Sequence, residues 1–280
     1  MKFGFQLARY AVPQLPQRLA DLAQRLEASV FDSFWLMDHL FQIEALGPVE
    51  EDMLEAYTTL GFLAGVTRKI QLGAMVTSVT FRHPGLLIKM AATLDVLSGG
   101  RSWLGLGAGW FEREHRGLGI PFPNVSERFE RLEETLQILQ HSGRPHYGKY
   151  YRLEEPLFRP LRKPPVLIGG MGEKRTLRLV ARYAQAGNFY QAAGLAEITH
   201  KLAVLRRHCS EVGRDYGEIE KTTLGVFTPG QKRPFLEELR ALQSIGIGTA
   251  VVGVLEPWNA AAVGELIEVL KYFRDTYSGP

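Results

Sequence analysis

The sequence contains one cysteine, Cys209, among its 280 residues. An internal disulfide is therefore excluded, which is typical of a protein from a reducing compartment. No run approaches the ~18 consecutive apolar residues that a membrane-spanning helix requires. The first residues, MKFGFQLARY, show neither the apolar core nor the small-residue cleavage site of a secretory signal. We therefore expect a soluble, cytoplasmic protein.

Strong charge of either sign is also missing. Lys and Arg total 33 against 30 Asp and Glu, which gives a formal net charge of +3, and like charges form no long block. Proteins that bind nucleic acids usually carry a clustered basic excess. We therefore expect neither nucleic acid nor a membrane as a partner. The mild basic excess suits an anionic small molecule.

Several common catalytic motifs are absent as well. The dinucleotide fingerprint Gly-x-Gly-x-x-Gly fails from Gly105, where its last position is Trp110, and from Gly107, where it is Glu112. No phosphate-binding loop ending in Gly-Lys-Ser/Thr and no Gly-x-Ser-x-Gly nucleophile elbow occurs. The seven histidines show no His-Glu-x-x-His spacing. We therefore expect no metal site and no serine nucleophile.

Short apolar runs alternate with segments of helical periodicity along the whole chain. The runs predict strands at 2–8, 33–39, 70–78, 101–109, 165–171, 187–192, 220–228 and 248–256. Repeated strand–helix alternation favours an all-parallel sheet that closes on itself. We therefore predict a single (β/α)8 TIM barrel over residues 1–280, with an open doubly wound sheet as the alternative.

One stretch interrupts the alternation. Residues 143–164 carry prolines, aromatics and charges without a helical period, and they lie between the predicted fourth helix and fifth strand. We interpret them as a short insertion made of a hairpin and a loop.

Other residues mark the starts of predicted helices. Asn124 followed by Glu127 resembles a capping box, Pro84 suits a first helical position, and His83 before it is best explained as a cap.

The predicted fourth strand has glycine at alternate positions in the run RSWLGLGAGWFE (101–112). Alternate residues of a strand face the same side, so Gly105, Gly107 and Gly109 would leave one face without side chains. Glycine in a strand marks a bulge or the close approach of another backbone or a ligand. A flat ring system lying on this face and a tight barrel interior that needs small residues remain equal interpretations.

Candidate site residues follow the strands, because active sites of such barrels lie at the carboxyl ends of the strands. They are Asp38, His39, Thr77, Ser78, Val79, Gly107, Ala108, Gly109, Glu112 and Asn188. His39 is a candidate acid or base, since histidine titrates near neutral pH; a hydrogen-bonded histidine of the rim is the alternative. Asp38 would hold the imidazole or the edge of a ring, or merely cap the next turn.

The turn after the predicted fifth strand has the clearest chemistry. It reads Gly169, Gly170, Met171 and Gly172, and Lys174 and Arg175 follow at the start of a helix. Glycines allow a close backbone approach, and the free N–H groups of a helix start attract an anion. The turn therefore predicts a phosphate cradle, with a tight turn that needs glycine for positive φ as the alternative.

Four segments resemble the luciferase-like family of flavin- and deazaflavin-dependent oxidoreductases. They are FDSFWLMDH, IQLGAMVTSVTFRHPGLLIKMAATLDVLSGGR, LGLGAGWFEREHRGLGIPFP with SERFERLEETLQIL, and VLIGGMGEKRTLRLVARYA. The resemblance extends over nearly the whole chain and is greatest to the branch that uses coenzyme F420, a 5-deazaflavin.

The resemblance implies an F420-dependent oxidoreductase that transfers hydride between the deazaflavin C5 and an unidentified small organic substrate. A monooxygenase that uses reduced FMN and a flavin- or deazaflavin-binding protein without turnover are the alternatives. A homodimer is common among similar proteins.

The resemblance also implies roles for individual residues. A non-proline cis peptide at Ser78–Val79 would support the ring. Catalysis is assigned to His39 and Asp38. The positions of the loops after the strands, independently of the resemblance, assign the substrate pocket to Gln6, Trp110 and Glu112. The implied cofactor contacts are Asp38, His39, Thr77, Ser78, Val79, Gly107, Ala108, Gly109, Gly169, Gly170, Met171, Gly172 and Asn188.

Overall fold

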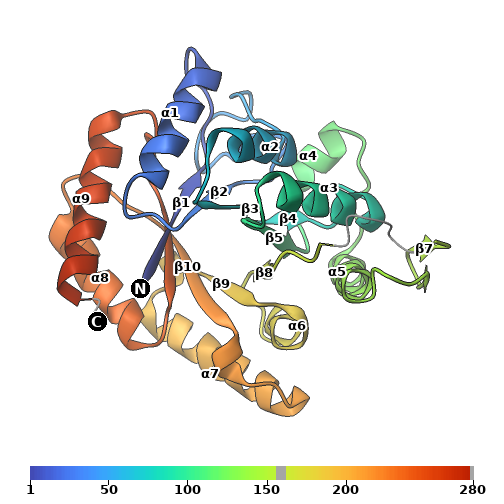
Figure 1. Cartoon of the computed structure of the whole chain (residues 1–280). Helices are drawn as coiled ribbons and strands as arrows, with labels where there is room; N and C mark the ends of the chain where they lie inside the picture. The colour runs from blue at the N-terminus through green and yellow to red at the C-terminus, as the bar shows by residue number, and fades with distance from the viewer. Residues whose placement is uncertain (156–161, 278–280) are drawn as a thin grey trace.

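Parallel strands form the centre of the molecule (Figure 1). The computed structural model describes residues 1–155 and 162–277. Its barrel strands are β1 (Lys2–Leu7), β2 (Ser33–Leu36), β3 (Gln71–Ala74), β4 (Thr77–Ser78), β5 (Ser102–Gly107), β8 (Val166–Gly169), β9 (Ala186–Tyr190), β10 (Glu220–Val226) and β11 (Thr249–Gly253). They pair in the order β3-β2-β1-β11-β10-β9-β8-β5, and pairing of β3 with β5 closes the ring. The predicted (β/α)8 barrel is confirmed, and the alternative prediction of an open doubly wound sheet is wrong.

Helices cover the outside of the barrel (Figure 1). They are α1 (Leu15–Glu27), α2 (Ala56–Val66), α3 (Pro84–Leu97), α4 (Glu112–Gly117), α5 (Val125–Gln140), α6 (Thr176–Tyr183), α7 (Leu195–Val212), α8 (Lys232–Ser244) and α9 (Ala260–Tyr277). A short 3₁₀ turn, η1 (Gln191–Ala193), follows β9. Within the described ranges, no helix combines the length and the apolar character needed to cross a bilayer.

The strands bury both of their faces, in two separate apolar layers. Phe3 and Phe5 of β1 point outward, where the Phe3 ring meets Phe273 of α9 edge-on at 5.8 Å between centroids. A second cluster fills the barrel itself and includes Trp35 and Leu167. Burying one such side chain contributes about 1.5–3 kcal/mol. The inner cluster therefore makes the barrel a solid support whose upper end alone remains open for a site.

Local signals in the sequence place the helix starts. The His83 Nδ1 accepts a hydrogen bond from the Gly85 amide at 3.2 Å at the start of α3, so the predicted cap is confirmed. Asn124 accepts from the Glu127 amide at 3.1 Å at the start of α5. Each contact satisfies a backbone N–H that has no partner within the helix.

The insertion begins with the predicted hairpin, formed by β6 (His146–Tyr147) and β7 (Arg152–Leu153). Glu134 of α5 fastens it, because its carboxylate lies 3.1 Å from His146 Nε2 and accepts from the Tyr151 amide at 2.8 Å. The part of the predicted loop at residues 156–161 lies outside the described residues.

The third barrel strand is interrupted between β3 and β4, where Met75–Val76 is a non-proline cis peptide. The predicted cis bond at Ser78–Val79 is therefore wrong. Ser78 is paired with Gly107 in the β4–β5 ladder, and the Val79 amide donates to the Gly107 carbonyl at 3.1 Å. The irregular step lies where pairing of β3 has ended and pairing of β4 has not begun.

The alternating glycines make room for this interruption. A Cβ on Gly105 would lie 1.9 Å from the Ala74 carbonyl oxygen, and one on Gly107 would lie 2.8 Å from a Val76 methyl. Gly109 has φ of +80°, and its Cβ would lie 2.2 Å from Ser78 Oγ. The bare face therefore accommodates the neighbouring segment of the same barrel, as the close approach of another backbone.

Replacing Gly105 with alanine is expected to destabilise the protein by about 3 kcal/mol, because the new methyl meets a backbone carbonyl that cannot move aside. Chemical denaturation of the purified variant measures this loss. Gly143→Ala is the matched control, since no atom lies within 4 Å of its Cβ position. Equal stability of the two variants would contradict the close approach described above.

Candidate active site

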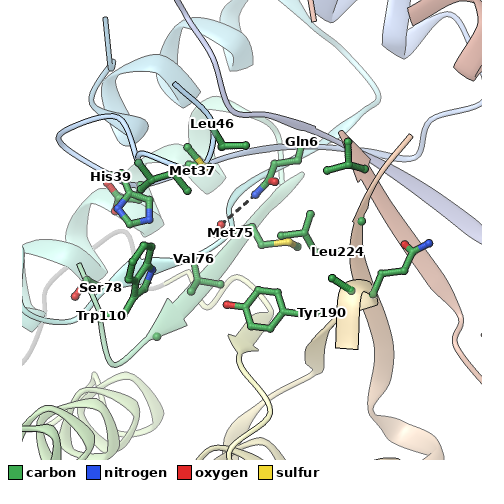
Figure 2. Close-up of a pocket in the computed structure, with 18 of the residues that line it drawn as sticks. Gln6, Met37, His39, Leu46, Met75, Val76, Ser78, Trp110, Tyr190 and Leu224 are labelled. Carbon is green, nitrogen blue, oxygen red and sulfur yellow. Dashed lines mark hydrogen bonds between the residues drawn. The ribbon is translucent and has the colours of Figure 1, made fainter. Parts of the chain in front are cut away.

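A cavity opens at the carboxyl ends of the barrel strands (Figure 2). Its volume is about 710 Å³. Its lining comes from many separate loops, as expected for this architecture. The lining residues are Gln6, Met37, Asp38, His39, Ile43, Leu46, Met75, Val76, Ser78, Phe81, Gly107, Gly109, Trp110, Glu114, Tyr190, Gln191, Ala192, Leu224, Gly225, Val226 and Glu238. Most are apolar, and none is lysine or arginine.

Val76 forms part of the cavity floor. Its methyl groups would lie 3.0 Å from a Cβ on Gly169 and 2.8 Å from one on Gly107, so glycines on two strands leave the space it occupies. The Met75 carbonyl beside it accepts a hydrogen bond from Gln6 Nε2 at 3.3 Å (Figure 2). Met75 and Val76 were not predicted as site residues, although the alternating glycines indicated that some segment had to approach there.

His39 faces the cavity and has a defined partner. Its Nδ1 lies 3.0 Å from Glu114 Oε1, and Glu114 Oε2 accepts from the Leu40 amide at 2.7 Å. The Glu114 side chain is 1% exposed. The indole of Trp110 meets the imidazole edge-on at 5.5 Å between centroids. One buried carboxylate therefore fixes both the imidazole and the backbone of the loop after β2.

Glu112 does not reach the cavity, so its predicted place in the substrate pocket is wrong. It is solvent-exposed and forms an ion pair with Arg116 at 2.8 Å. Residues two apart lie on nearly opposite faces of a helix, so α4 turns Glu114 inward when it turns Glu112 outward. Both carboxylates follow the predicted fourth strand in the sequence, but the sequence alone did not show which of the two would face inward.

Asp38 lines the cavity but does not hold the His39 ring. Arg82 donates to both of its oxygens, at 2.6 and 2.9 Å, and also pairs with Glu55. Burial alone would lower the pKa of Arg82, but hydrogen bonds and charge from Asp38 and Glu55 outweigh it and raise that pKa. The Arg82 guanidinium lies over the Tyr57 ring at 4.9 Å. The negative charge of Asp38 is therefore balanced by the Arg82 guanidinium.

Several predicted contacts are packed beside the cavity without lining it. Asn188 is buried and donates to Thr222 Oγ1 at 2.8 Å. Thr77 is hydrogen-bonded to the Tyr57 hydroxyl at 3.0 Å. Val79 and Ala108 pack in or against the apolar core. Gln6, Ser78, Gly107, Gly109 and Trp110 do line the cavity.

The predicted contacts Gly169, Gly170, Met171 and Gly172, in the turn after β8, do not line the cavity. Gly170 has φ of +112°, which favours glycine, and its amide donates to the Asn188 carbonyl at 3.2 Å. In the described chain, the amides of Met171, Gly172 and Lys174 donate to no protein acceptor. Polar N–H groups left free at a helix start suit an anion. The geometry thus carries features of both interpretations, a tight turn and an anion site.

Two further lining residues are Tyr190, the last residue of β9, and Gln191, which follows it. Gln191 is 6% exposed, and its Oε1 is buried without a hydrogen-bond partner in the described residues. A Cβ on Gly225 would lie 1.9 Å from that oxygen. Glycine at 225 therefore makes room for Gln191, a relation between separate strands that periodicity does not reveal.

The fold and the cavity at its mouth define a barrel enzyme of the luciferase type. The sequence model of the luciferase-like monooxygenase family matches residues 2–261, so the chain belongs to this family. It is 30% identical over 236 residues to the F420-dependent glucose-6-phosphate dehydrogenase of Kineococcus radiotolerans, covering 79% of this chain and 66% of that protein. It is also 30% identical over 279 residues to a phthiodiolone/phenolphthiodiolone dimycocerosates ketoreductase of Mycobacterium bovis, covering 91% and 72%.

Solved structures give the same fold. An F420-dependent secondary alcohol dehydrogenase in complex with an F420-acetone adduct superposes with a TM-score of 0.81 at 20% identity, covering 98% of this chain and 99% of that one. EDTA monooxygenase superposes with a TM-score of 0.81 at 14% identity, covering 100% and 95%. At these identities the likeness concerns the fold alone. The matched stretch spans only about two thirds of the length of the Kineococcus relative.

Proposed function

We propose that this protein is an F420-dependent oxidoreductase that acts on a neutral, largely apolar alcohol or carbonyl compound. The observation that carries the proposal is the cavity at the barrel mouth, which joins an apolar floor to a histidine held by a buried carboxylate. Relatives named for F420 dependence and for ketone reduction support the cofactor and the reaction type.

The residues fit a deazaflavin with a phosphate-bearing tail. A cavity of about 710 Å³ admits a ring system together with a small substrate. The apolar floor at Val76 suits a flat ring, and the free amides of Met171 and Gly172 suit the phosphate. When bound, the deazaflavin supplies or accepts the hydride at C5.

His39 is the residue we assign to proton transfer. Its Nδ1 faces the Glu114 carboxylate, which can only accept, so Nδ1 carries a hydrogen and Nε2 is left free. Nε2 then accepts the proton of a substrate hydroxyl during oxidation, or returns it to the oxygen during reduction. Trp110 packs edge-on against the imidazole, and Figure 2 shows the two side chains next to each other at the cavity.

The charges of the cavity favour a neutral substrate. No lysine or arginine lines it, and two of its three carboxylates, Asp38 and Glu114, are already engaged. A phosphorylated sugar would find no cationic partner among these lining residues. Met75, Leu46 and Leu224 instead offer apolar surface, as expected for a pocket that takes an apolar molecule.

Binding separates this proposal from its alternatives. We expect F420 to bind at least ~10-fold tighter than FMN, a difference of about 1.4 kcal/mol, in fluorescence titrations of the purified protein. Tighter binding of FMN together with oxygen uptake would instead support a reduced-flavin monooxygenase. A protein that binds neither would refute the proposal. Binding of F420 with no measurable turnover, unaffected by His39→Ala, would support a binding protein without catalysis.

The variant Glu114→Gln is expected to lower kcat by about 10- to 100-fold with F420 affinity unchanged, because a charge-assisted hydrogen bond contributes about 1.5–3 kcal/mol. Steady-state kinetics and ¹⁵N NMR of the His39 tautomer measure the effect. Glu134→Gln is the matched control, since it weakens an equally buried Glu–His pair at the hairpin. Equal losses in both variants would show that Glu114 acts only on stability.

We also propose that two copies of the chain associate through α2 and α3. These neighbouring helices expose Phe62, Leu86, Val96 and Leu97, the last of which is 64% exposed. Large apolar side chains exposed on neighbouring helices suit a protein interface. Light scattering is expected to give twice the chain mass of 31.4 kDa, and Leu97→Glu to halve it. Tyr272→Glu on α9 is the control, and a monomeric wild type would contradict the proposal.

A further inference from the structure

The amide group of Gln191 is a polar group of the cavity that the proposed reaction does not use. Gln191 lines the cavity and is only 6% exposed. Its Oε1 is enclosed without a partner, and its Nε2, the more accessible end of the amide, forms no hydrogen bond within the described residues either. Leaving a buried amide unpaired is unfavourable. The amide therefore suits a partner that a bound ligand supplies.

The neighbouring backbone keeps this amide in place. Tyr190 and Leu224 are paired across β9 and β10, and Gln191 and Gly225 follow them by one residue. A Cβ on Gly225 would lie 1.9 Å from Gln191 Oε1, and the other two atoms nearest to it also belong to Gln191. The Gly194 amide donates to the Gln191 carbonyl at 3.0 Å and closes the turn η1. The position of the amide thus depends on the absence of a side chain at Gly225.

Gln191 follows the strand that lies across the barrel from the strand before His39. In the closed order of strands, β1, β11 and β10 separate β2 from β9 on one side, and β3, β5 and β8 separate them on the other. The ends of β2 and β9 are therefore opposite each other. Figure 2 shows Tyr190 and Leu224 on the other side of the cavity from His39. A molecule that reacts at His39 can therefore extend its far end toward Gln191.

The charges at this far end favour a neutral polar group. Glu238 of α8 also lines the cavity, and it forms no ion pair in the part of the chain that the structure describes. No lysine or arginine lines the cavity to attract an anion. A carboxylate or phosphate would be repelled by Glu238, whereas a hydroxyl group accepts a hydrogen bond from an amide N–H without carrying charge.

We propose that Gln191 is a specificity-determining residue that recognises a second hydroxyl group on the substrate, remote from the carbon that reacts. This inference rests on the proposed function and narrows its substrate class to neutral alcohols or carbonyl compounds that carry a further hydroxyl. Nε2 of Gln191 donates to the oxygen of this hydroxyl. The carbon chain between the two polar ends lies against apolar side chains of the cavity, among them Met75 and Leu224.

The test measures binding of paired alcohols to the protein loaded with reduced F420, on which an alcohol cannot be oxidised. The pairs are 2-hexanol with 1,5-hexanediol and 2-octanol with 1,7-octanediol, titrated by calorimetry. In at least one pair, the ratio of dissociation constants should favour the diol about 3- to 10-fold more in wild type than in Gln191→Met, because one neutral hydrogen bond is lost. The affinity for F420 should not change.

A second variant tests the same contact without altering Gln191. Gly225→Ala places a methyl group where Oε1 lies, and the flexible end of Gln191 must move away. It should reduce the preference for the diol as Gln191→Met does. Thermal unfolding should show that Gln191→Met is at least as stable as wild type, because an unpaired buried amide is removed.

Gln243→Met on α8 is the matched control, since Gln243 does not line the cavity. It should keep the wild-type ratio. The inference is overturned if neither pair shows a change of ratio in Gln191→Met, if no alcohol binds, or if this variant loses F420 affinity, which would assign the amide to the cofactor. Those outcomes leave binding of F420 by wild type intact. Failure of wild type to bind F420 would instead overturn the proposed function.

Discussion

The site depends on the close approach of Val76 and its neighbours to strands that carry no side chains there. A Cβ on Gly105, Gly107 or Gly169 would contact Ala74 or Val76 at 3.0 Å or less. Protein interiors are packed too densely to absorb such an overlap. The glycines therefore allow the chain between β3 and β4 to lean across the end of the barrel. That segment separates the solid apolar interior below from the open cavity above, so it determines where a ligand can rest.

The buried carboxylates around this floor are each paired with a partner. Asp38 is matched by Arg82, and Glu114 by His39 and the Leu40 amide. An unpaired buried carboxylate would be costly, whereas a paired one is tolerated. The cavity consequently offers one free imidazole nitrogen and much apolar surface, with no cation available for a charged substrate.

Much of this arrangement could be predicted from the sequence. Apolar periodicity revealed the strands and helices because it reflects burial directly, and the strand ends then located His39 and Gln6 at the mouth. Other features depend on relations between segments that are distant in sequence. The cis peptide lies at Met75–Val76, before β4 begins its pairing with β5, and not at the predicted Ser78–Val79. The helical phase of α4 directs Glu114 toward His39 and Glu112 toward solvent. Asn188 illustrates the same limit, because its partner Thr222 lies on another strand.

Trp110 has a consequence of its own. Although its indole touches His39, the side chain is 60% exposed and carries little of the core. Exposed positions tolerate substitution with small changes in stability. A substitution at position 110 can therefore change the width of the cavity entrance with little effect on the stability of the barrel. A lineage that inherits this scaffold can broaden or narrow the range of molecules it admits through one codon, while the His39–Glu114 pair beneath stays as it was.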